Sequence, residues 1–236
     1  MSTSDVEALL RRVRTVLLDF DGPVCSIFAG YPAPAVADEL AAVSASAGYP
    51  VPGSYLLRSD PLDVLRFAGT IGAELVALIE RELCRAELDA ADSAEEAPGA
   101  GAFLTACRST GRTLAIVSNN SADAITRYLD RIGWAELVDA IEGRDPSDPE
   151  LMKPHPHVLL RTLGHLAAPA ESAVMVGDSL TDIAAGLAAD VWTIGYANKP
   201  GKDEAMREAG AHLVLGSMVE LAEDTKRTPP APEARP

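Results

Sequence analysis

The feature that most constrains this chain is a short apolar run, formed by Val13, Val16, Leu17 and Leu18, that leads directly into the stretch Asp19-Phe-Asp21-Gly22. Such a run is typical of a strand buried on both faces of a parallel sheet, so Asp19 falls at the strand's carboxyl end, where open α/β sheets bind ligands. Alternate residues of an extended chain share a face, and Gly22 lets the backbone turn closely around a ligand. Asp19 and Asp21 could therefore share one divalent cation; the alternative is an ordinary turn that ends a strand.

Predicted strands and helices alternate through most of the chain with short connections. The patterns predict strands at 13–18, 113–118, 137–141, 172–176, 191–194 and 212–215. They predict accompanying helices at 5–12, 101–109, 122–132, 156–163, 181–188, 203–209 and 218–223. This order predicts the α/β class, with a doubly wound, mostly parallel, Rossmann-like sheet.

One long segment, residues 25–95, interrupts this alternation and has no strand pattern. It has helical patterns at 35–47, 61–68 and 73–91, and it is far longer than an ordinary strand-to-helix connection. We therefore expect an inserted α-helical domain at 25–95, here called the cap, within a Rossmann-like core made of 1–24 and 96–224. Residues 225–236 are rich in proline and charge, which predicts a disordered tail.

Composition excludes several classes of protein. The net charge of −15 disfavours a nucleic-acid surface, because phosphate contacts need clustered Lys and Arg. No apolar run is long enough to span a membrane, and the charged start of the chain is unlike a signal peptide, so we expect a cytoplasmic protein. Cys25, Cys84 and Cys107 are odd in number and widely spaced, which indicates reduced thiols rather than disulfides or a zinc site.

Two polar stretches beyond the insert carry candidate phosphate ligands. Ser118-Asn119-Asn120 follows a predicted strand and places a hydroxyl, an amide and helix N-terminal N–H groups where an anion could bind, although such residues also serve simply as helix caps. Lys153 is one of four lysines and stands before Pro154-His155-Pro156. The prolines fix the backbone, so Lys153 could offer a fixed charge to a phosphate; the alternative is a surface lysine.

A third stretch, Gly177-Asp178-Ser-Leu-Thr-Asp182, ends another apolar strand with an acid. Asp178 directly follows the strand and is a candidate metal ligand. Asp182 lies four residues later on the predicted helix, where it could also be an ordinary first-turn acid that favours the helix dipole.

In this order and at these separations, the four stretches resemble the motifs of the haloacid dehalogenase superfamily of phosphohydrolases, with a helical cap of the phosphoglycolate-phosphatase-like kind. Asp19-Phe-Asp21-Gly matches the first motif, Ser118 the second, Lys153 the third and Gly177 to Asp182 the fourth. The resemblance implies that Asp19 is the nucleophile and forms an aspartyl phosphate. It implies that Asp21 is the general acid and base, and that Asp19, Asp178 and the backbone carbonyl of Asp21 bind Mg²⁺.

The same resemblance implies that Ser118 and Lys153 bind the substrate phosphate and that Asp182, behind them, orients Lys153 or metal-bound water. We expect the N–H of Gly22 and the amide of Asn119 to add donors. The physics of phosphoryl transfer supports this set, because a carboxylate and a phosphate repel each other until a cation and a lysine neutralise the site.

The expected function is therefore a Mg²⁺-dependent phosphatase acting on a small phosphorylated metabolite. A sugar phosphomutase of the same fold and a non-catalytic phosphate-binding or regulatory protein remain as alternatives. Pro23 departs from the family pattern, which usually has Thr or Val after the glycine. The cap residues Arg58 and Arg66 could face either the substrate or solvent.

Overall fold

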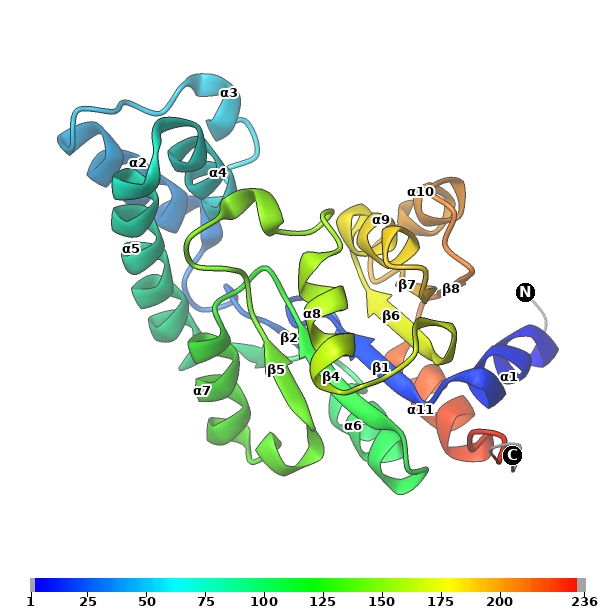
Figure 1. Cartoon of the computed structure of the whole chain (residues 1–236). Coiled ribbons are helices and arrows are strands. Elements are labelled where there is room, and N and C mark those ends of the chain that lie inside the picture. Colours follow the sequence, from blue (N-terminus) through cyan, green and yellow to red (C-terminus); the bar gives the residue numbers. More distant parts are fainter. Residues whose placement is uncertain (1–2, 233–236) are drawn as a thin grey trace.

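The computed structural model describes residues 3–232 and contains a six-stranded sheet whose neighbouring strands are all parallel. The strand order is β5-β4-β1-β6-β7-β8 (Figure 1). The strands are β1 (Thr15–Leu18), β4 (Thr113–Val117), β5 (Ala140–Glu142), β6 (Ala173–Gly177), β7 (Trp192–Tyr196) and β8 (Leu213–Leu215). The predicted α/β class with a mostly parallel sheet is confirmed.

Alternate side chains of β1 enter different cores, which explains why residues 16–18 of this strand are all apolar. Val16 and Leu18 pack on one side with helices α1 (Thr3–Arg12), α6 (Ala100–Ser109), α7 (Ala122–Ile132) and α11 (Met218–Arg227). Leu17 packs on the other side with α8 (His157–His165) and α9 (Leu180–Ala188). Helix α10 (Lys202–Glu208) joins that side through Met206, which packs beside Ile183. Helices therefore cover both faces, as in a doubly wound sheet.

The insert forms a separate helical lobe beside the carboxyl edge of the sheet (Figure 1). Its helices are α2 (Ala33–Ser46), α3 (Gly53–Leu56), α4 (Pro61–Ile71) and α5 (Ala73–Ala91). They have an apolar core of their own, which includes Leu40, Val64, Phe67, Ile79 and Leu83. Asp60 begins α4 by accepting a hydrogen bond from the N–H of Leu62, with Pro61 as the first helical residue.

The two connections between the lobe and the sheet pair with each other, which the sequence patterns did not predict. Strand β2 (Cys25–Ser26) and strand β3 (Glu95–Glu96) form an antiparallel pair. Two-residue strands have no readable alternation, so backbone pairing alone defines them. The pair lies close to the boundaries predicted for the cap, and the division into core and cap domains stays a prediction.

Two further elements differ from the sequence patterns. The strand predicted at 137–141 starts later in the structure, because Leu137 ends the 3₁₀ helix η1 (Ala135–Leu137) and β5 begins at Ala140. Further 3₁₀ helices are η2 (Pro149–Leu151) and η3 (Ala170–Ser172). Helix α11 extends to Arg227, beyond the residue 224 at which we expected order to end. Thr225 and Thr228 are buried, and the guanidinium of Arg112 donates to both of their carbonyls. Residues 233–236 of the expected tail lie outside the described residues.

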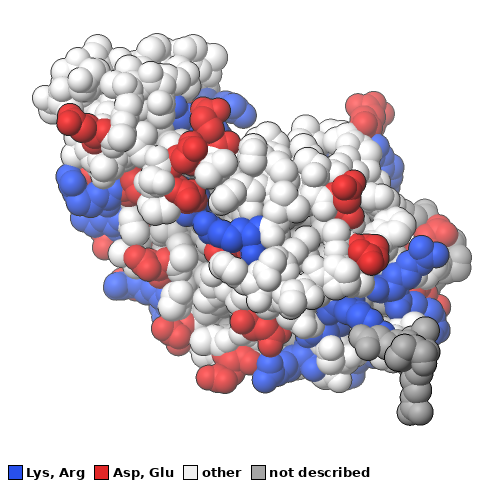
Figure 2. All heavy atoms as spheres, in the orientation of Figure 1, with Lys and Arg blue, Asp and Glu red and all other residues white. Residues whose placement is uncertain are grey.

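The face of the molecule in Figure 2 carries charged side chains of both signs. On the face in Figure 2, basic and acidic side chains are interspersed and form no continuous basic surface. The outer end of the cap is white in this view, and residues 40–57 contain no charged side chain. Among residues 3–232, no helix combines the length and the apolar character needed to cross a membrane.

Helix α9 lies so close to the sheet that a glycine is required at its contact with β7. A Cβ at Gly186 would lie 2.5 Å from Thr193 Cγ2, whereas a Cβ at Gly164 in α8 would meet nothing within 4 Å. Gly186→Ala should therefore lower the free energy of unfolding by about 1–3 kcal/mol through overpacking. Gly164→Ala should raise it by roughly 0.5–1 kcal/mol, because alanine favours a helix. Urea unfolding of both variants measures the difference; equal effects would contradict this packing.

Candidate active site

The predicted site residues meet at a cavity of about 570 Å³ between the carboxyl edge of the sheet and the cap. Strands β1, β4 and β6 end at this edge, and the residues that follow them enter the cavity wall. From the core the lining includes Asp19, Asp21, Ser118, Asn119, Lys153, Asp178 and Asp182, and from the cap Arg58, Ser59, Asp60 and Arg66. Gly22 is the one predicted site residue that does not line the cavity; it lies behind Asp178.

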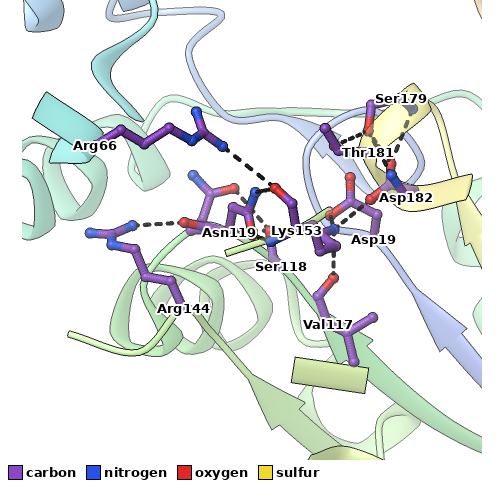
Figure 3. Close-up of polar contacts among 11 residues, drawn as sticks. Asp19, Arg66, Val117, Ser118, Asn119, Arg144, Lys153, Ser179, Thr181 and Asp182 are labelled. Carbon is purple, nitrogen blue, oxygen red and sulfur yellow. Dashed lines mark hydrogen bonds and ion pairs between the residues drawn. The ribbon is translucent and has the colours of Figure 1, made fainter. Parts of the chain in front are cut away.

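The ammonium of Lys153 lies between two carboxylates at the centre of this cluster (Figure 3). Its Nζ donates to Asp19 Oδ1 at 2.7 Å and to Asp182 Oδ1 at 2.6 Å, and a third bond reaches the Val117 carbonyl at 3.2 Å. The side chain is only 2% exposed, so the alternative of a surface lysine is wrong. Burial alone would lower the pKa of Lys153, but the adjacent Asp182 and Asp19 outweigh it and raise that pKa.

Asp182 serves both the helix and the lysine. Its Oδ2 accepts hydrogen bonds from the backbone N–H and the hydroxyl of Ser179, which completes a capping box at the start of α9. Its Oδ1 faces Lys153. From the sequence, Asp182 could be either a first-turn helix acid or a partner of Lys153. In the structure it is both.

Negative charge remains in excess around Asp19. Burial raises the pKa of Asp19 to about 8, with the neighbouring Asp182 as the next cause, and Lys153 only partly opposes them. Asp19, Asp178 and Asp182 each offer a carboxylate oxygen, and these atoms lie within 4.8 Å of one another. Carboxylate oxygens are hard ligands that suit Mg²⁺, and Lys153 alone does not neutralise these three carboxylates. The donor set therefore fits Mg²⁺.

Asp21 stands apart from that cluster. It is exposed, and its Oδ1 accepts a hydrogen bond at 3.0 Å from the N–H of Ile27, where the chain enters the cap. The cluster of converging carboxylates contains Asp182 in place of Asp21. A metal role for Asp21 is therefore left to its backbone carbonyl and stays a prediction.

The turn after Asp21 changes the expected role of Gly22. The N–H of Gly22 already donates to the Cys25 carbonyl at 2.7 Å, so it is not a free phosphate donor as we had expected. Gly22 instead lets the turn lie close to the Asp178 side chain. Its φ is +113°, and a Cβ at this position would lie 2.4 Å from Asp178 Cγ. Val24 and Cys25 both donate to the Phe20 carbonyl, so this turn closes without an N–H at Pro23.

The loop after β4 uses its amides to hold the site together. Asn119 Oδ1 accepts from the Lys153 N–H at 2.8 Å, and Asn119 Nδ2 donates to the Lys153 carbonyl at 3.2 Å (Figure 3). Both ends of this amide are thus occupied, which replaces our expectation that it binds phosphate. Ser118 Oγ donates to Asn120 Oδ1 at 3.1 Å and must rotate its proton to reach an anion. The helix cap of α7 is Ser121, not Ser118.

Several residues at this site escaped the sequence patterns. Lys202 Nζ donates to Asp178 Oδ2 at 2.6 Å, and Asn198 Nδ2 donates to the same oxygen at 2.9 Å. The sequence indicated only that both residues follow the strand β7, and therefore that they lie near the same edge of the sheet. Glu87 and Arg144 reach the loop after β4 from the cap and from the end of β5, and nothing in their spacing indicated this.

Replacing Lys153 should destabilise the protein strongly. Lys153→Met leaves Asp19 and Asp182 buried without their common cation, and loss of one partner from a buried ion pair costs roughly 3–5 kcal/mol. The control is Lys199→Met at an exposed position, which should change stability by less than about 0.5 kcal/mol. Urea unfolding in the presence of a chelator measures both, and a Lys153→Met variant as stable as the parent would contradict the described pairing.

Comparisons with known proteins find a family match and relatives with assigned activities. Residues 13–190 match the family model of haloacid dehalogenase-like hydrolases. A phosphoglycolate phosphatase of Nitrosococcus oceani is 29% identical over 126 residues, which are 52% of this chain and 54% of that protein. Pyrophosphatase PpaX of Halalkalibacterium halodurans is 36% identical over 113 residues, 47% of this chain and 51% of that protein. The matches thus span about half the length of these relatives.

Solved structures share the fold over nearly the whole chain. A haloacid dehalogenase family hydrolase of Deinococcus radiodurans, with bound phosphate and sodium, has a TM-score of 0.58 at 25% identity and covers 94% of this chain and 100% of its own. The β-phosphoglucomutase of Clostridium difficile has a TM-score of 0.63 at 18% identity, with 91% and 98% covered. The family match spans most of the chain, including the strand ends that carry Asp19, Ser118 and Asp178. The chain therefore belongs to the haloacid dehalogenase-like hydrolase family.

Proposed function

We propose that this protein is a Mg²⁺-dependent phosphatase that hydrolyses a small phosphorylated metabolite. The observation that carries the proposal is the buried Lys153 ammonium, which contacts Asp19 at the wall of a cavity that also contains Asp178. A nucleophilic carboxylate beside a fixed cation is what attack on an anionic phosphoryl group requires. The cavity of about 570 Å³ suits a small metabolite.

In this reaction Asp19 attacks phosphorus, and the bond to the ester oxygen breaks as the new carboxylate–phosphorus bond forms. Asp21 donates a proton to the leaving oxygen; its position near the cap entrance, held by Ile27, suits contact with the leaving group. Asp21 then takes a proton from water, which attacks phosphorus, releases phosphate and restores Asp19. Lys153 and Ser118 hold the phosphoryl oxygens as charge builds on them.

Asp19 and Asp178 would hold Mg²⁺, which supplies positive charge to the phosphoryl oxygens when bound. Asp182 and Lys202 would not contact the substrate in this proposal. Asp182 keeps the Lys153 ammonium in place. Lys202 and Asn198 fix the orientation of the Asp178 carboxylate.

A sugar phosphomutase is the second candidate. It is favoured by one observation, the similarity in fold to the β-phosphoglucomutase of Clostridium difficile. The two functions share Asp19 and Asp21 and differ in whether water or a second sugar hydroxyl accepts the phosphoryl group. Release of inorganic phosphate from a panel of phosphorylated metabolites, compared with formation of isomeric sugar phosphates, separates them.

Phosphate release should require both Mg²⁺ and Asp19. Asp19→Asn removes the nucleophile while keeping the shape of the side chain, and we expect activity to fall by at least about 10³-fold. The matched control is Asp38→Asn at an exposed cap position, which should retain parental activity. A colorimetric phosphate assay with Mg²⁺ and with chelator measures this; full activity in chelator or in Asp19→Asn would refute the mechanism.

Metal affinity should separate Asp21 from Asp178. Asp21→Asn keeps the backbone carbonyl, so it should bind Mg²⁺ within about threefold of the parent and yet lose turnover. Asp178→Asn removes a carboxylate from the converging cluster and should weaken Mg²⁺ binding by at least about tenfold. Calorimetric titration with Mg²⁺ tests this directly, and the reverse order of affinities would overturn these assignments.

A further inference from the structure

A carboxylate of the cap is buried against the loop that follows β4. Glu87, on helix α5, is completely inaccessible to solvent. Its Oε1 accepts from Arg144 Nη1 at 2.7 Å and from Asn120 Nδ2 at 3.1 Å, and its Oε2 accepts from the Ser121 N–H at 3.0 Å. All these donors belong to the core, so Glu87 joins the cap to the loop that carries Ser118.

Arg144 connects the same loop to the cap a second time. Its side chain is inaccessible, and its Nε donates to Glu80 Oε2 at 2.7 Å, two helical turns from Glu87 on α5. Its Nη1 also donates to the Asn119 carbonyl at 3.0 Å (Figure 3). One guanidinium therefore binds two carboxylates of the cap and one carbonyl of the loop.

These contacts determine how the loop presents its side chains. Because the Nδ2 of Asn120 faces Glu87, its Oδ1 must face the other way, and it accepts the bond from Ser118 Oγ. The Asn120 N–H also donates to Ser118 Oγ at 3.2 Å, which places that oxygen. Arg144 fixes the backbone of Asn119, whose amide in turn pairs with the backbone of Lys153.

We propose that Glu87 and Arg144 are positioning residues of the phosphate site. They hold the loop that carries Ser118 in the arrangement that binds a phosphoryl group, and they make this arrangement depend on helix α5 of the cap. The inference rests on the proposed phosphatase function, because it gives the loop its phosphate ligand.

The chemistry of the contact favours this role over simple attachment of the cap. Burying three charges is costly, and apolar side chains of similar volume could hold α5 against the core equally well. Apolar side chains could not orient the amide of Asn120 or bind the carbonyl of Asn119. The exposed pair Arg127–Asp92 also links α7 to the end of α5, and its bonds involve no residue of the loop.

The test compares phosphate binding with stability. The triple variant Glu80→Gln/Glu87→Leu/Arg144→Met removes every charge of the cluster, so no buried charge is left unpaired. With Mg²⁺ present, calorimetry measures the dissociation constant of inorganic phosphate, and urea unfolding measures stability. We expect phosphate binding to weaken at least about tenfold while the variant still unfolds cooperatively. Glu87→Gln keeps the shape of the side chain and the Arg144–Glu80 pair; it should weaken phosphate binding at least threefold even if the triple variant does not fold.

Arg127→Met is the matched control, because it breaks an exposed cap-to-core pair, and its phosphate affinity should stay within twofold of the parent. Phosphate affinity within twofold of the parent in Glu87→Gln would overturn the proposal and leave the cluster as a cap attachment, whether or not the triple variant folds. If the parent binds phosphate but releases none from any substrate, the phosphatase function fails while the dissociation constants still decide the positioning role. A parent that does not bind phosphate overturns both.

Discussion

The pairing of one buried ammonium, Lys153, with Asp19 and Asp182 is the interaction on which the rest of the site depends. An ammonium that is 2% exposed is stable only beside compensating charges, and the two carboxylates come from different elements: Asp19 follows β1, and Asp182 lies in the first turn of α9. The backbone of Lys153 must therefore be fixed in position. The amide of Asn119 does this by pairing with both backbone groups of Lys153, and the guanidinium of Arg66 lies 3.5 Å from the same carbonyl.

The parallel sheet makes this convergence possible, because β1, β4 and β6 are adjacent and end at one edge. Their apolar residues pack into the cores on both faces of the sheet. The first residue beyond each strand lies outside these cores and can be polar. The cap then supplies the opposite wall of the cavity and, through Glu87 and Arg144, reaches the loop that follows β4. In this account the cap both encloses substrate and contributes to the shape of the phosphate site.

Much of this arrangement could be predicted from the sequence, because it depends on local pattern. Apolar runs followed by Asp19, Ser118 and Asp178 identify strand ends, and a common sheet edge brings them together. What the sequence could not indicate depends on tertiary contacts: the pairing of β2 with β3, the hydrogen bond that occupies the Gly22 N–H, and the amide of Asn119 turned toward Lys153. Glu87 lies on a helix with many other charged residues, and its sequence position does not mark it as buried. Its burial depends on how α5 packs on the core.

The central claim is that Asp19 becomes covalently phosphorylated during turnover. The most direct measurement is acid quenching of the enzyme during hydrolysis of a phosphate ester, followed by peptide mass spectrometry. The account predicts a phosphoryl group on the peptide that contains Asp19, its absence in Asp19→Asn, and its accumulation in Asp21→Asn when the ester has a good leaving group. Turnover by the parent with the phosphoryl group on another residue, or with no phosphorylated aspartate under any quench condition, would contradict the account.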